Sequence, residues 1–300
     1  MENLELLHHF TTVTYMTITL DSEIMEFWRL KIPKIALSYE FVMHALLATS
    51  ALHLSFLRSS DETFARAAER HHENAVASMK IALTAKHLPP GDAIYAGNTL
   101  ASRYAYSRLP PAEYVLPTAP LWIPVLRGVF KTTRQFFERI KGGVLLPLVA
   151  SKMNDNCPYP GEHIEFPSSL FDLSKRGISG GLDPEEDEDD QSLEIYHETT
   201  TALQLFWNQY WLVTARESVA FSWPATMSEG YERLISQQRP RALVILAHHC
   251  VLVESLGKEF WWAKGRGVDE IKRIEGVLEE KWKHWLDWPM AKCKILKETV

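Results

Sequence analysis

The sequence predicts an all-α protein built as a single large helical domain. Apolar residues recur at steps of three and four over most of the chain, and capping residues, prolines and glycines separate these stretches. No segment alternates apolar and polar residues as a half-buried strand does. With 300 residues, 46% of them hydrophobic and 23% charged, the chain can bury a large core.

Residues 1–150 are expected to form an N-terminal helical part. Its first helix, residues 4–17, carries an apolar stripe that should face the core, made of Leu4, Leu6, Leu7, Phe10 and Val13. A short helix from Glu23 to Leu30 should end near Pro33. The next helix, residues 38–58, is rich in Ala, Leu and Met, and we expect it to lie at the centre of the fold.

Asp61 should cap a helix that runs to Thr84, in which Glu62 and Arg66 have the spacing of an ion pair. Further helices are expected over 92–108 and 121–143, and the second of these ends in a glycine pair suited to a C-terminal cap. The proline-rich segment 110–120 between them cannot be helical throughout.

Residues 151–190 predict an acidic flexible insertion, because the like charges of DPEEDEDD repel one another. Residues 191–300 should form a C-terminal helical part. Its helices are expected over 191–217, 226–237, the almost wholly apolar stretch from Arg239, and 268–288.

Charge and cysteine content exclude several classes of function. A net charge of -6 and a pI near 6.1 give no basic field, so we expect no direct contact with nucleic acid. Three widely spaced cysteines argue against a disulfide scaffold and favour a reducing compartment, the nucleus or the cytoplasm. No secretory leader and no membrane span are expected.

No pattern of metal ligands or catalytic residues stands out. His248 and His249 are neighbours, so on a helix their side chains point about 100° apart and cannot chelate one ion. Asp189 and Asp190 have the paired acids of a magnesium-binding motif, but their spacing to Glu194 is wrong, and they are better explained as acids at a helix N-terminus. The catalytic residues are therefore unknown, and neither a metal nor a cofactor is expected.

Two buried-looking polar residues have simple structural interpretations. His249 is better explained as a buried histidine hydrogen-bonded to a neighbour than as a general base or ligand contact. Glu254 is expected to pair with Lys258 one turn later. The late tryptophans Trp261, Trp262, Trp282, Trp285 and Trp288 should mostly pack in the core.

Several segments together resemble the ligand-sensing regulatory domain of fungal zinc-cluster transcription factors, of the sterol uptake control type. They are IPKIALSYEFVMHALLATSALHLS, LWIPVLRGVF followed by GGVLLPLV, FSWPATMSEGYERLISQQRPRALVILAHHCVLV, and FWWAKGRGVDEIKRIEGVLEEKWKHWLDWP. RPRALVILAHH with the paired tryptophans and WLDWP is the most specific combination. The resemblance covers nearly the whole chain outside the acidic insertion.

The resemblance implies an all-α domain whose C-terminal helices line a hydrophobic pocket for ergosterol. Such a pocket needs broad apolar walls and a few polar groups for the hydroxyl. Carried over residue by residue, the pocket wall comprises Leu243, Leu246, His249, Cys250, Val253, Trp261, Trp262 and Gly265.

Two functions fit this pattern. In the first, the chain is a transcription-factor-like regulatory protein that binds a sterol or other isoprenoid. It would act through a protein partner or as a homodimer, since the family's six-cysteine DNA-binding cluster does not occur in the sequence. In the alternative, the chain is an enzyme of fungal secondary metabolism, a terpene cyclase that uses the same pocket with magnesium and stabilises carbocations on tryptophan faces.

Overall fold

The protein is seen in a computed structural model, which describes residues 1–59, 61–107, 122–141, 143, 163–177, 189–213 and 216–298. Throughout these residues the regular elements are helices and none is a strand, which confirms the all-α prediction. The chain forms two compact units. Unit 1 comprises Met1–Arg108, Val125–Asp155 and Glu259–Trp262, and unit 2 comprises Leu109–Pro124, Asn156–Lys258 and Ala263–Val300. Most of the predicted insertion, 151–190, lies outside the described residues.

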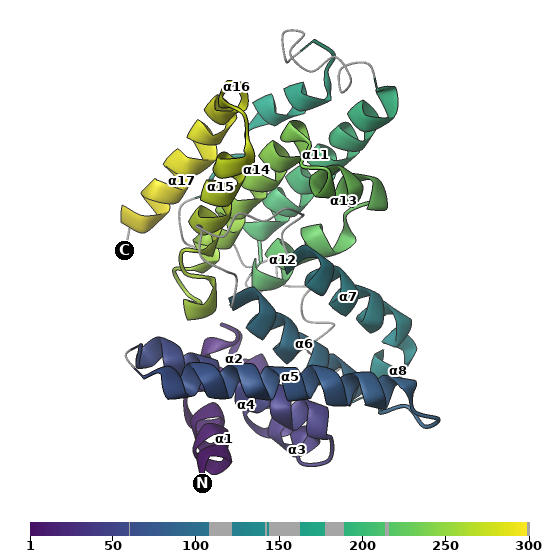
Figure 1. Ribbon diagram of the computed structural model, residues 1–300, viewed down its shortest axis with the longest axis vertical. Coiled ribbons are helices and arrows are strands. Elements are labelled where there is room, and N and C mark those ends of the chain that lie inside the picture. Colours follow the sequence, from purple (N-terminus) through teal and green to yellow (C-terminus); the bar gives the residue numbers. More distant parts are fainter. Residues whose placement is uncertain are drawn as a thin grey trace. The chain divides into compact units, whose positions relative to one another are not determined.

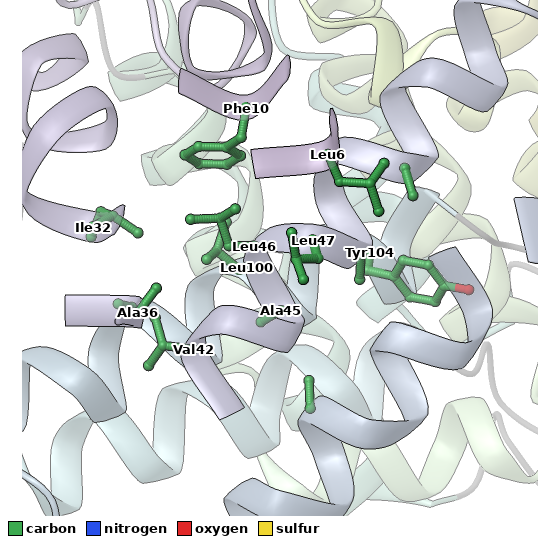
Figure 2. Packing of buried hydrophobic residues seen from close by; sticks show 14 of the residues in the cluster. Leu6, Phe10, Ile32, Ala36, Val42, Ala45, Leu46, Leu47, Leu100 and Tyr104 are labelled. Carbon is green, nitrogen blue, oxygen red and sulfur yellow. The ribbon is translucent and has the colours of Figure 1, made fainter. Parts of the chain in front are cut away.

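Unit 1 is arranged around an apolar central helix. Its main elements are α1 (Glu2–Thr12), α3 (Ile32–Ala36), α4 (Glu40–Leu57), α5 (Glu62–Thr84) and α6 (Gly91–Ser107). Helix α4 packs against the other four, and Figure 1 shows it lying along α5. The core seen in Figure 2 gathers Val42, Ala45, Leu46 and Leu47 of α4 with Leu6 and Phe10 of α1 and Leu100 of α6. The expected central position of this helix is therefore confirmed.

Local capping follows the expected chemistry. Asp61 accepts a hydrogen bond from the Thr63 backbone N–H at 2.9 Å, and α5 ends at Thr84 as predicted. Arg66 and Glu62 form the expected ion pair at 3.1 Å. Asp189 caps α11 (Asp190–Tyr210) by accepting from the Gln191 backbone N–H. The interpretation of this acidic pair as a helix N-terminus is confirmed.

Three helix predictions were wrong in detail. Leu4 is 65% exposed, because residues two apart on a helix point to nearly opposite sides and Leu6 occupies the core face. The chain stays helical past Pro33, since a wide turn over Phe27–Lys31 places the proline in the first turn of α3, where no backbone donor is required. The helix predicted over 191–217 ends at Tyr210.

Unit 2 surrounds helix α14 (Pro240–Leu256), which contacts α11, α12 (Arg216–Thr226), α13 (Glu229–Ser236), α15 (Arg266–Val277) and α17 (Asp287–Glu298). Figure 1 shows α14 beside α15 and α17. Every residue from Arg241 to Leu256 is buried. A helix that is apolar on all sides is expected at such a central position.

Helices α14 and α15 approach closely because residue 267 is a glycine. A Cβ at that position would lie 2.3 Å from the Cys250 carbonyl oxygen and 2.7 Å from the Cβ of Glu254. Neither neighbour can move without shifting α14, since one is backbone and the other is attached directly to it.

Gly267→Ala should therefore lower the free energy of unfolding by about 1–3 kcal/mol, as overpacking of a close contact does. Gly276→Ala is the matched control on the same helix, where a Cβ would meet nothing within 4 Å. For Gly276→Ala we expect the free energy of unfolding to rise by up to about 1 kcal/mol, because alanine has a higher helix propensity than glycine. Urea unfolding measures both, and equal midpoints for the two variants would contradict the close approach.

Candidate functional site

The candidate site is the middle of α14, where two adjacent histidines interrupt an apolar helix. The Nδ1 of His248 bonds at 2.8 Å to the Val244 carbonyl of its own helix, and its ring stacks on Trp288 at 5.4 Å. The Nε2 of His249 lies 2.7 Å from the Ala220 carbonyl oxygen on α12. The two side chains thus have different partners, as their adjacent positions on a helix predict.

His249 is a neutral, hydrogen-bonded core residue. A carbonyl oxygen can only accept, so the Nε2–H of His249 donates to Ala220. Burial lowers the pKa of His249 to about 4, against the opposing effect of this hydrogen bond. The prediction of a buried histidine satisfied by a neighbour is confirmed for Nε2.

Two tryptophan rings lie nearly parallel to the His249 imidazole. Trp223 of α12 stacks at 4.7 Å with an interplanar angle of 26°, and Trp122, the first residue of α7 (Trp122–Gln135), at 6.2 Å with an angle of 24°. Both rings are buried. Sequence reasoning missed them as neighbours of His249, although LWIPVLRGVF and FSWPATM, the segments that contain them, contributed to the family resemblance.

The remaining predicted pocket residues fall into two groups. Leu243, Leu246, Cys250 and Val253 are buried on α14 within unit 2. Trp261 and Trp262 belong instead to unit 1. There Trp261 stacks on His53 at 4.9 Å, and its Nε1–H donates to the hydroxyl of Thr17 at 3.0 Å. The C-terminal pocket itself stays a prediction.

Gly265 has a conformational role that the sequence did not reveal. Its φ of 78° lies in the left-handed region, where a side chain would be strained, and it is the N-cap residue of α15. This turn brings the N-terminus of α15 to Glu254, whose Oε2 accepts a hydrogen bond from the Val268 backbone N–H at 3.1 Å. The predicted pairing of Glu254 with Lys258 was wrong, because Glu254 is buried and faces the positive end of a helix.

Two further buried groups near α14 have altered acidity. Burial, with the neighbouring Glu270, raises the pKa of the Cys250 thiol, so this cysteine is an unreactive apolar residue at neutral pH. Burial also raises the pKa of Glu270, although Arg273 pairs with it one turn along α15 and opposes the rise. In the described part of the chain, no three His, Cys, Asp or Glu side chains come together as a metal site.

A narrow crevice lies in unit 1, where Thr17, Thr49, Leu52 and Arg103 meet Trp261 and Trp262. It has room for about one water molecule. A sterol is far larger, so this crevice as it stands is no candidate for the lipid site.

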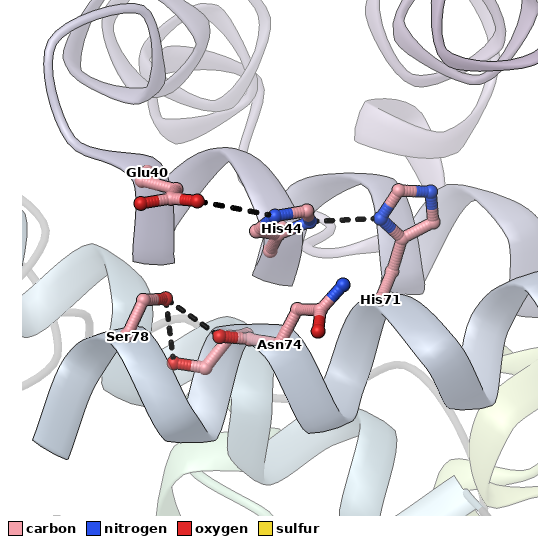
Figure 3. Close-up of polar contacts among 6 residues, drawn as sticks. Glu40, His44, His71, Asn74 and Ser78 are labelled. Atoms are coloured by element: carbon pink, nitrogen blue, oxygen red, sulfur yellow. Dashed lines mark hydrogen bonds and ion pairs between the residues drawn. The ribbon is translucent and has the colours of Figure 1, made fainter.

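Unit 1 also contains a chain of polar contacts between α4 and α5, drawn in Figure 3. His44 and His71 bond through their Nδ1 atoms at 2.9 Å, so one ring donates and the other accepts. Glu40 lies 3.8 Å from the Nε2 of His44, and Glu2 of α1 lies 3.9 Å from the Nε2 of His71. Burial lowers the pKa of His71 to about 4, with smaller contributions from His44 and Arg70.

Acid should destabilise unit 1 through these histidines. Burial also lowers the pKa values of His53 and His72 to about 4, from 6.5. Because the folded state binds fewer protons than the unfolded state, the stability is complete above about pH 6.5 and falls as the pH drops towards 4. Urea unfolding at a series of pH values measures this loss. The variant His71→Gln should lose less free energy of unfolding between pH 6.5 and 4 than the wild type does. The exposed control His87→Gln should lose as much as the wild type. Equal losses in the two variants would contradict the contribution of His71.

One helix has the length and composition of a membrane span. Within the described residues this is Glu40–Leu57, or α4, and 67% of that window is buried inside the structure. Buried helices at the centre of a folded domain often have this length and composition, so these two properties support a membrane span only weakly.

Comparison with known proteins agrees with the predicted family resemblance. Residues 5–100 match the family described as the fungal specific transcription factor domain. A Zn(2)-C6 fungal-type transcription factor of Gibberella zeae is 24% identical over 97% of this chain and 61% of its own length. This chain resembles the regulatory region of fungal Zn(2)-C6 transcription factors.

Two further relatives extend this resemblance. The Zn(2)-C6 fungal-type transcription factor afumD of Aspergillus fumigatus is 24% identical over 83% of this chain and 66% of its own length. Sterol uptake control protein 2 of Saccharomyces cerevisiae is 48% identical over 54 residues, which are 18% of this chain and 6% of that protein. The chain thus spans less than two thirds of the Zn(2)-C6 relatives it matches. The terpene cyclase alternative finds no support in these matches or in the described residues.

Proposed function

We propose that this chain is a ligand-sensing regulatory module that binds a sterol or another isoprenoid among the helices of unit 2. The observation that carries the proposal is α14, a wholly buried helix with a neutral imidazole at its middle beside two tryptophan rings. Ligand sites in helical proteins form between such helices, with apolar walls and few polar groups. A relative named for the control of sterol uptake adds support for the ligand class.

The module acts on transcription through a protein partner or a second copy of itself, in the nucleus or the cytoplasm. Its resemblance to Zn(2)-C6 transcription factors supports the role in transcription. Its net charge of -6 does not favour direct attraction to DNA, so the signal passes through protein contacts.

Sterol binding can be measured by energy transfer from tryptophan to dehydroergosterol, a fluorescent sterol. We expect saturable transfer with a dissociation constant in the micromolar range or below, and competition by ergosterol. A folded protein that shows no saturation at micromolar sterol would contradict the proposal.

The position of the site is tested by adding volume to α14. Leu246→Phe enlarges a fully buried side chain, and Leu205→Phe makes the same change where the leucine on α11 is 67% exposed. We expect the first variant to weaken sterol binding about tenfold, which corresponds to about 1.4 kcal/mol of overpacking, and the second to leave it unchanged. Circular dichroism should show the helical spectrum of the wild type for both variants. If the two variants bind the sterol with equal affinity, the sterol does not bind beside Leu246 of α14.

A further inference from the structure

The second ring nitrogen of His249 is a buried hydrogen-bond acceptor. The Ala220 carbonyl fixes the tautomer in which Nε2 carries the proton, so Nδ1 presents a lone pair. This Nδ1 is buried and has no hydrogen-bond partner among the described residues. Buried polar atoms of native proteins are nearly always paired, and an unpaired one needs an explanation such as a bound molecule.

The surroundings of His249 restrict what can approach Nδ1. Trp223 and Trp122 lie nearly parallel to the imidazole, and Nδ1 lies on the edge of that ring. A partner must therefore arrive in the ring plane with an O–H or N–H group. The walls contributed by α14 around it, including Leu246 and Val253, are apolar.

The buried charges described in unit 2 balance, with Glu217, Glu254 and Glu270 against Arg216, Arg241 and Arg273, so they give an anionic ligand no excess of positive charge. Two carboxylates, Glu254 and Glu270, are buried on α14 and α15. The buried arginines on these helices already have acceptors. Arg241 donates to the carbonyl oxygens of Leu173 and Lys175, and Arg273 donates to Glu270. A diphosphate would therefore find no surplus positive charge and would have to compete for guanidinium groups that already have acceptors.

We propose that His249 Nδ1 accepts a hydrogen bond from the hydroxyl group of the ligand, so that unit 2 selects a free apolar alcohol over its ether, its ester or its diphosphate. This inference rests on the proposed function, since it specifies the ligand of the same site. The apolar body of the alcohol lies along α14, and its hydroxyl supplies the donor that Nδ1 lacks.

The deciding comparison is between ergosterol and its 3-methyl ether, which keeps the ring system and loses only the donor. The wild-type chain should bind the alcohol at least about tenfold more tightly, the effect of one buried hydrogen bond. In His249→Phe the preference should disappear. In the matched control His248→Phe, where the native nitrogen bonds to its own helix, it should persist.

A second measurement does not depend on any variant folding. The ¹⁵N resonance of His249 Nδ1 in the wild-type protein should move upfield when ergosterol is added, as an acceptor nitrogen does on hydrogen bonding, and should move less with the methyl ether. Farnesol and farnesyl diphosphate with magnesium provide a second pair, of which the alcohol should bind more tightly.

The outcomes separate this inference from the function on which it rests. If alcohol and ether bind equally, or if the Nδ1 resonance does not move, the role of His249 is overturned and sterol binding stands. A preference that survives in His249→Phe, or tighter binding of the diphosphate, also overturns it. If neither sterol binds the folded protein, the proposed function fails and this inference fails with it.

Discussion

Burial of α14 on every side is the constraint on which unit 2 depends. A helix without a solvent-facing side must satisfy each polar group inside the protein, because an unpaired buried group costs about 1–3 kcal/mol. His248 forms a hydrogen bond to the backbone of its own helix, and His249 forms one to the carbonyl of Ala220. Glu254 accepts a hydrogen bond from the N-terminus of α15. Arg241 donates to two carbonyl oxygens at the end of η4 (Ser168–Ser174). These bonds connect α14 to the elements around it, and on α14 itself the acceptor His249 Nδ1 has no partner among the described residues.

The α14–α15 contact shows how one glycine supports this arrangement. The backbone at Gly267 lies against the Cys250 carbonyl, and this closeness places the Val268 N–H within reach of Glu254. The buried carboxylate then faces the positive end of α15, where its charge is stabilised. The absence of a side chain at Gly267 therefore allows both the close packing of the two helices and the hydrogen bond to the buried carboxylate.

Unit 1 satisfies its buried polar groups in a similar way around α4. Ser50 donates to the Leu6 carbonyl of α1 at 2.7 Å, and His53 bonds to Thr14 at 3.1 Å. These contacts connect α1 and the helical turn after it (Thr14–Thr17) to α4 through neutral groups, which costs less than burying charge. Much of this unit falls within residues 5–100, the region that matches the fungal specific transcription factor domain.

The sequence by itself determined the all-α class, the caps at Asp61 and Asp189, the central position of α4 and the burial of His249. Each depends on local periodicity or on contacts within one or two turns of a helix, which the order of residues specifies directly. Only the tertiary structure decided that Glu254 bonds to Val268 rather than pairing with Lys258, that Trp122 and Trp223 stack near His249, and that Trp261 and Trp262 belong to unit 1. Those partners are distant in sequence or lie across a turn, and they meet only because of how whole helices pack, which no local pattern encodes.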